Sequence, residues 1–133
     1  MAVYYARITG AILLIMGVIG AAGFHLQSTF SLLTPGQIAI HIVVGAIALI
    51  IGLTNSRQSM LPRTYARWIS VFFLLLTIVG YIRPALLGDP SLLFLSPGDN
   101  MVHLIAGLWG AYVGYFAPPP AMAADLHHAA GHA

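Results

Sequence analysis

Two stretches of this sequence share one pattern and decide the fold: LTPGQIAIHIVVG at 33–45 and LSPGDNMVHLIAG at 95–107. In both, a hydroxyl residue precedes proline and glycine, and an apolar run follows with a histidine and, four residues later, another glycine. Thr34 and Ser96 are of the types preferred as helix N-caps, and proline is favoured in the first helical turn. A Gln or Asp three residues after the cap completes the spacing of a capping box. The pattern therefore predicts a helix after each cap.

Four apolar stretches have the length of membrane-crossing helices. Each is close to the roughly 20 residues needed to cross a hydrocarbon core about 30 Å thick. Hydrophobic residues make up 59% of the 133 residues and charged residues 6%, whereas a soluble domain has about 25% charged residues. We therefore expect an all-α membrane protein with four transmembrane helices in residues 1–117, followed by a Pro/Ala/His-rich tail at 118–133. The stretches are approximately 5–24, 35–54, 65–82 and 97–117.

The apolar stretches also form an internal repeat. Tyr-Ala-Arg opens the first stretch at Tyr5 and the third at Tyr65, which is an offset of 60. The second and fourth stretches match at an offset of 62, which aligns His41 with His103. The sequence thus predicts two tandem helical hairpins, 5–54 and 65–117. Each hairpin returns to the side where it began, so the copies should be parallel and related by a pseudo-twofold axis along the membrane normal.

Arginine positions predict the orientation. Most arginines flank the start of the first stretch or the connection between the second and third, and the remaining one, Arg83, is accompanied by Asp89. The positive-inside rule then places both termini and the 55–64 connection in the cytoplasm. We expect a multi-pass protein of the bacterial cytoplasmic (inner) membrane. The arginines on the expected cytoplasmic side are Arg7, Arg57, Arg63 and Arg67.

The scarcity of reactive and charged residues argues against several functions. The chain has no cysteine and no lysine, and its formal net charge is +2, so the sequence gives no indication of a thiol nucleophile or of nucleic-acid binding. The three acids are far apart, at Asp89, Asp99 and Asp125, and no carboxylate pair is suggested. The histidines of the tail do not form a convincing metal motif. We therefore expect no enzyme activity and no metal site.

His41 and His103 are the main candidates for a binding function. Each lies six residues after the helix-starting proline, about 9 Å along a helix axis. Ionisable residues at such depth are candidates for function. Two neutral imidazoles on neighbouring helices could ligate haem iron or chlorophyll magnesium, or act on a proton or ion. The third interpretation, a hydrogen bond to a neighbouring helix, is the one we expect, because the glycine one turn deeper favours close packing over a porphyrin.

Small residues on the second and fourth stretches predict close helix packing. Asn100 lies three residues before His103, on the same helical face, and is expected to orient its ring. The positions expected to serve helix packing or orientation are Asn100, Gly45, Gly52, Gly107, Gly110 and Gly114.

The Tyr-Ala-Arg openings and the DNMVHLIAG segment at 99–107 resemble a family of small bacterial four-helix integral membrane proteins, classed as a domain of unknown function. The resemblance covers roughly 3–117. The first repeat departs from the motif, because Ile38 stands where the second has Asn100. The resemblance implies the four-helix membrane fold and brings no activity.

We therefore expect a non-enzymatic structural or accessory membrane protein. It would contact the lipid bilayer and pack as a small subunit against other membrane proteins or against itself. The alternative is a haem- or chlorophyll-binding module that uses His41 and His103. A small channel or transporter ranks third, because the apolar stretches offer no polar path.

Overall fold

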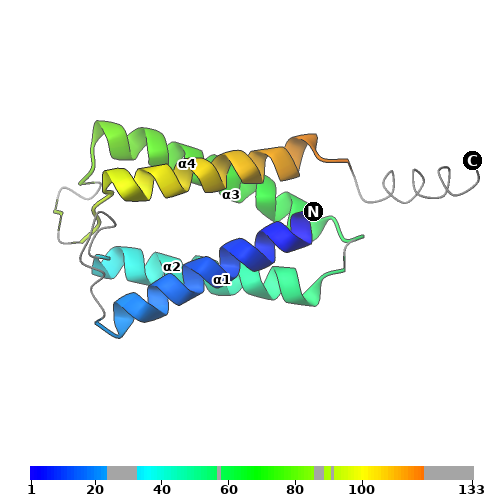
Figure 1. Ribbon diagram of the computed structural model, residues 1–133, viewed down its shortest axis with the longest axis horizontal. Coiled ribbons are helices and arrows are strands. Elements are labelled where there is room, and N and C mark those ends of the chain that lie inside the picture. Colours follow the sequence, from blue (N-terminus) through cyan, green and yellow to red (C-terminus); the bar gives the residue numbers. More distant parts are fainter. Residues whose placement is uncertain (24–32, 57, 86–88, 91, 119–133) are drawn as a thin grey trace, which may run out of the picture.

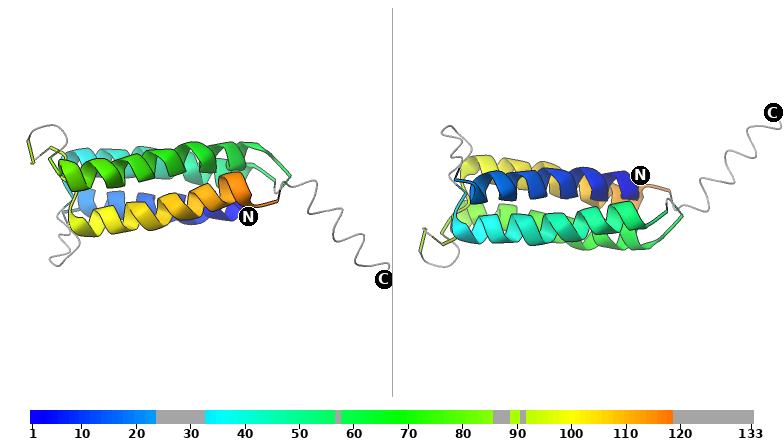
Figure 2. Two further views of the ribbon diagram at one scale, coloured as in Figure 1. Left: turned by 90° about the horizontal axis from the view of Figure 1, so that it is seen from above. Right: turned by 90° about the horizontal axis from the view of Figure 1, so that it is seen from below.

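The computed structural model describes residues 1–23, 33–56, 58–85, 89–90 and 92–118. The described part contains four helices: α1 (Ala2–Ala21), α2 (Pro35–Thr54), α3 (Leu61–Ile82) and α4 (Pro97–Ala111). The last continues as a π-helix, η1 (Tyr112–Phe116). The helices lie side by side and alternate in direction, with the N-terminus and the end of η1 at the same end of the bundle (Figures 1 and 2).

Three of the helices, α1, α2 and α3, are long and apolar enough to cross a membrane. The expectation of an all-helical fold is therefore confirmed for the described residues, and three of its helices have the length and composition of membrane spans. Helices α1 and α3 begin earlier than the apolar stretches suggested, at Ala2 and Leu61. In α3 the cause is Pro62, which occupies the first helical turn, where its missing N–H costs no hydrogen bond.

Both predicted capping boxes are present. The Thr34 backbone N–H donates to Gln37 Oε1 at 2.8 Å, and the Gln37 backbone N–H donates to Thr34 Oγ1 at 3.4 Å. At α4, Ser96 N–H donates to Asp99 Oδ2 at 2.9 Å, and Asp99 N–H donates to Ser96 Oγ at 3.1 Å. Helices α2 and α4 therefore begin where the sequence predicted. We call this end of the bundle the cap end.

Each helix packs most extensively against its neighbour in the chain, α1 against α2 and α3 against α4. We call these pairs the first and the second hairpin. A Cβ added at Gly45 would lie 2.6 Å from the backbone nitrogen of Leu14. One added at Gly107 would lie 2.9 Å from Leu74 Cγ. The two glycines therefore let the helices of each hairpin approach more closely than any larger residue would allow.

Arginines close both hairpins at the other end, which we call the arginine end. Arg7 Nε donates to Gly52 O at 2.7 Å, and Arg67 Nε donates to Gly114 O at 2.8 Å. Arg63, which is buried, also donates to Gly114 O, at 3.0 Å. Carbonyl oxygens near a helix C-terminus carry partial negative charge and attract cations. The arginine that opens each hairpin is thus bound to the last turns of the helix that ends it.

The hairpins meet chiefly through α1 and α3. Tyr5 is fully buried, and its hydroxyl donates to Ala106 O at 3.0 Å. Gly110 leaves room for its ring, because a Cβ there would lie 2.5 Å from the Tyr5 hydroxyl. The buried cluster at this junction contains Tyr5, Ala66, Ile69, Phe73 and Val113. Except for Pro118, the tail predicted at 118–133 lies outside the described residues.

Replacing Gly45 by alanine should destabilise the protein, because its Cβ would meet the backbone of Leu14 rather than a side chain that can move. Overpacking of this kind costs about 1–3 kcal/mol. A thermal melt in detergent should show a lower Tm than the wild type. Ile50→Ala, on the exposed face of the same helix, is the matched control and should change the Tm little. An unchanged Tm for Gly45→Ala would contradict the close approach.

Candidate functional site

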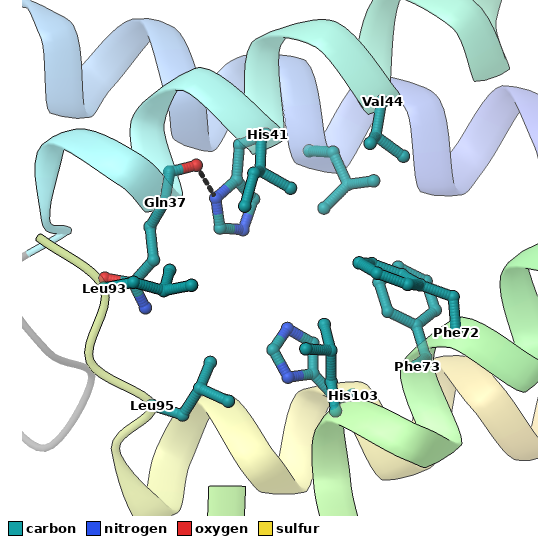
Figure 3. Close-up of a pocket in the computed structure, with 11 residues that line it drawn as sticks. Gln37, His41, Val44, Phe72, Phe73, Leu93, Leu95 and His103 are labelled. Carbon is teal, nitrogen blue, oxygen red and sulfur yellow. Dashed lines mark hydrogen bonds between the residues drawn. The ribbon is translucent and has the colours of Figure 1, made fainter. Parts of the chain in front are cut away.

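The two histidines singled out from the sequence come together in the structure. His41 of α2 and His103 of α4 line one cavity, and Figure 3 shows their rings facing each other across it. The cavity is about 30 Å³, enough for about one or two water molecules. It lies close to the cap end, where Leu93 and Leu95 contribute to its wall. The pairing of the imidazoles is the central feature of the site.

His41 is bonded to its own helix. Its Nδ1 lies 2.6 Å from the backbone oxygen of Gln37, one turn earlier. Since a carbonyl oxygen only accepts, the neutral ring must carry its proton on Nδ1 and have an acceptor at Nε2. Figure 3 shows this second nitrogen directed into the cavity, towards His103. The bond differs from the interhelical hydrogen bond that we expected, because the carbonyl one turn back is within reach of the ring.

His103 is buried, with 8% of its surface exposed, and its Nδ1 has no hydrogen-bond partner among the described residues. Its ring stacks on Phe73 of α3, with centroids 5.4 Å apart and planes at 13°. A buried polar atom without a partner costs about 1–3 kcal/mol. The ring is thus held in place by an aromatic contact while part of its hydrogen-bonding capacity remains unused.

A polar contact between the hairpins lies at the cap end of the site. Gln37 Nε2 donates to Asp99 Oδ2 at 3.2 Å, so one capping side chain binds the other. The sequence predicted only a helix-capping role for these two residues. Their alignment at an offset of 62 in the sequence was the available signal. The contact joins the first turns of α2 and α4 beside the histidines.

A larger hollow opens on the α1/α4 side of the imidazoles. It is about 240 Å³ and is lined by apolar side chains, with the polar groups of Thr9, His41 and His103 among them. Trp109 forms part of its wall and packs edge-on against Tyr5, with centroids 4.9 Å apart. This hollow was not predicted, because its size depends on which side chains meet across the hairpins.

The two sides of the histidine pair differ in side-chain volume. On the α2/α3 side the cavity of 30 Å³ is bounded by Val44 and Phe72. At the positions equivalent in the repeat, the α1/α4 side has Ala106 and Ile12. A further hollow of about 340 Å³ opens on the outside of the α2/α3 side and is lined by Val44 and Phe72 among others, but neither histidine lines it. The hollow beside the smaller residues is the one that reaches both imidazoles. The two sides of the site therefore differ at positions that correspond at the sequence offsets of 60 and 62.

Asn100 does not act on His103 in the way that we expected. Its side chain lies against Gly80 of α3, and its backbone oxygen accepts a hydrogen bond from Thr77 Oγ1 at 3.4 Å. Among the described residues no hydrogen bond joins it to His103. Gly80 has no side chain to obstruct the amide, so the short distance to α3 decides where it points. The expected packing glycines lie at helix contacts: Gly45 and Gly107 within the hairpins, Gly52 and Gly114 at the arginines, and Gly110 at Tyr5.

The size of the cavity bears on the haem and chlorophyll alternative. A space of about 30 Å³ between the rings is far below the 300–1,000 Å³ or so of typical cofactor pockets. A macrocycle ligated by both His41 and His103 would require the hairpins to separate. In the part of the chain that the structure describes, no three His, Cys, Asp or Glu residues are grouped as they would be to hold a metal ion. The space between the two rings is better suited to a water molecule or a small polar group.

Comparisons with protein families, with curated proteins and with solved structures give no match to this chain.

Leucine at His103 should raise the Tm or leave it unchanged. It removes a buried nitrogen without a partner, which costs about 1–3 kcal/mol, and keeps the apolar contact with Phe73. Leucine at His41 loses the bond to Gln37 O and should lower the Tm modestly, by the equivalent of about 0.5–1.5 kcal/mol. Paired thermal melts measure both. A larger loss for His103→Leu than for His41→Leu would contradict the assignment.

Proposed function

We propose that this chain is a non-enzymatic accessory protein of the membrane, formed by four spans in two tandem, parallel hairpins. The observation that carries the architecture is that the same contacts occur in both hairpins at the offsets of the sequence repeat. Arg7 binds Gly52 O in the first hairpin as Arg67 binds Gly114 O in the second.

Packing contacts support the same equivalence. In each hairpin the central glycine of the second helix meets the equivalent residue of the first, and a glycine near the cap end receives the side chain at the Ile38 or Asn100 position. These matches follow the offsets of 60 and 62 along whole helices, which low-complexity apolar sequence alone does not explain. The matched pairs are Gly45–Leu14 with Gly107–Leu74, and Gly20–Ile38 with Gly80–Asn100.

The fourth span rests on the combined length of α4 and η1. Pro97–Ala111 and Tyr112–Phe116 together make twenty residues, close to the roughly 20 that a span requires. They run alongside the three helices that are long enough to cross (Figure 2). A helix that lay on the membrane surface could not remain parallel to these neighbours.

The polar groups of the described residues support an accessory role rather than catalysis. Arg7, Arg63 and Arg67 bind carbonyl groups, and Thr9 and Thr77 donate to the carbonyl one turn back. These groups serve helix packing. The outer surface of the bundle is apolar and rich in exposed Ile, Leu, Val and aromatic side chains. Such a surface is suited to contact with lipid and with another membrane protein.

Topology can be measured directly, because the chain has no cysteine of its own. Single cysteines at Ser59, Asp89 and Pro118 should react with a membrane-impermeant maleimide in a sidedness assay. From the arginine distribution, Ser59→Cys and Pro118→Cys should react only from the cytoplasmic side and Asp89→Cys only from the opposite side. Reaction of Asp89→Cys and Pro118→Cys from the same side would exclude a crossing by α4.

The accessory role predicts a stoichiometric partner. Mild solubilisation of native membranes, with the chain at its natural level, should yield one particle that also contains a second membrane protein or further copies of this chain. Mass determination of the native particle tests this. A lone monomer in native membranes, after crosslinking before solubilisation, would contradict it.

Visible spectroscopy tests the haem and chlorophyll alternative. The small space between His41 and His103 leads us to expect that the natively purified protein has no Soret or chlorophyll band. A band in the wild type that disappears in His41→Leu and His103→Leu would replace our proposal by the cofactor alternative.

A further inference from the structure

We propose that the α1/α4 hollow binds the head group of a membrane-dissolved quinone, with the two imidazoles as its polar contacts. The inference rests on the proposed four-span placement, which puts the mouth of the hollow in lipid. Ile12, Val102 and Ile105 line the hollow and are exposed on the outside of the bundle. A ligand dissolved in the bilayer could therefore enter sideways between α1 and α4.

The two histidines provide the hydrogen-bonding groups that a ligand in this hollow would have to match. His103 is 8% exposed, its ring faces the space shared with His41, and its Nδ1 has no partner among the described residues. His41 has its proton fixed on Nδ1 by Gln37 O, which leaves Nε2 as an acceptor. A neutral His103 has one N–H to donate. Together the pair offers a donor and an acceptor within an otherwise apolar hollow.

Quinones match this combination of groups. A ring carbonyl accepts a hydrogen bond from an imidazole N–H, and the hydroxyl of the reduced form donates to an imidazole nitrogen. An acyl chain has no polar group to offer at that depth, so it would leave His103 Nδ1 without a partner, and a buried polar atom without a partner is unfavourable.

The shape of the hollow favours a flat ring. Phe73 is fixed by its stacking on His103, and Trp109 by its edge-on contact with Tyr5, so two aromatic side chains form walls of fixed orientation. The cavity of about 240 Å³ accommodates a head group, and the isoprenoid chain would extend between Ile12 and Ile105 into lipid. Aromatic rings stack well on such walls.

The repeat itself supplies the variants for the test. Ala106→Val and Ile12→Phe each introduce the residue that the other hairpin has at the equivalent position, Val44 and Phe72. The outer hollow beside Val44 and Phe72 does not reach the histidines, so both substitutions should close the α1/α4 hollow off from the imidazoles. Ile50→Phe, an exposed position outside the hollow, adds the same bulk elsewhere and serves as the control.

Binding can be followed through Trp109, since quinones quench indole fluorescence. The protein with Trp68→Phe, which leaves Trp109 as its one tryptophan, is placed in lipid nanodiscs and titrated with decylubiquinone and a short-chain menaquinone. We expect saturable quenching. Ala106→Val and Ile12→Phe should abolish saturation. His103→Leu should raise the apparent Kd at least about tenfold with no loss in Tm, and Ile50→Phe should match the parent.

Linear, non-saturable quenching in the parent would overturn the proposal, because it indicates collisions in the bilayer. Saturation that persists in both filled variants, or that is indifferent to His103→Leu, would also overturn it and would point to an acyl-type occupant. If the Ala106→Val protein has a clearly lowered Tm, the quenching titration of Ile12→Phe is the result that decides. Failure of the four-span placement is separable, because the cysteine-labelling pattern reports it independently of quenching.

Discussion

Close contact between helix backbones at Gly45 and Gly107 is the constraint on which the rest of the structure depends. A glycine at this point brings α2 against Leu14 of α1, and α4 against Leu74 of α3. The histidine of each motif lies one turn earlier on the same helical face. The close packing at each glycine therefore also places the histidine of the same helix inside the bundle. The histidines are buried because of the hairpin geometry, and they meet because the hairpins lie side by side.

Side chains of different size at corresponding positions of the two hairpins explain why the two sides of the histidine pair are unlike. A pair of identical hairpins would have the same space on both sides of the histidines. Here the outer hollow beside Val44 and Phe72 does not reach the histidines, whereas the hollow beside Ala106 and Ile12 does. Tyr5 adds to the difference, because its hydroxyl binds Ala106 O. The contacts that both hairpins share are thus made by glycine, arginine and capping residues, while the asymmetry that a ligand could use is provided by apolar side chains of different size.

Much of the fold could be predicted from local chemistry, and much of the site could not. Capping residues act within one turn, so the starts of α2 and α4 followed directly from Thr34 and Ser96. The alignment of His41 with His103 at an offset of 62 indicated that the two histidines form a pair. The π-helix at the end of α4 and the bond from His41 to Gln37 O did not, because they depend on distances between specific atoms. The hollow depends on side-chain volumes contributed by several helices, which periodicity does not encode.

Equivalence of the two hairpins is the central claim, and distances between spin labels test it most directly. Labels at Ile15 and Val43 in the first hairpin, and at Leu75 and Ile105 in the second, occupy exposed positions that the repeat makes equivalent. Double electron–electron resonance in nanodiscs should give overlapping distance distributions for the pairs 15–43 and 75–105. Clearly separate distributions would show that the hairpins are not copies of one structure, and would contradict the account.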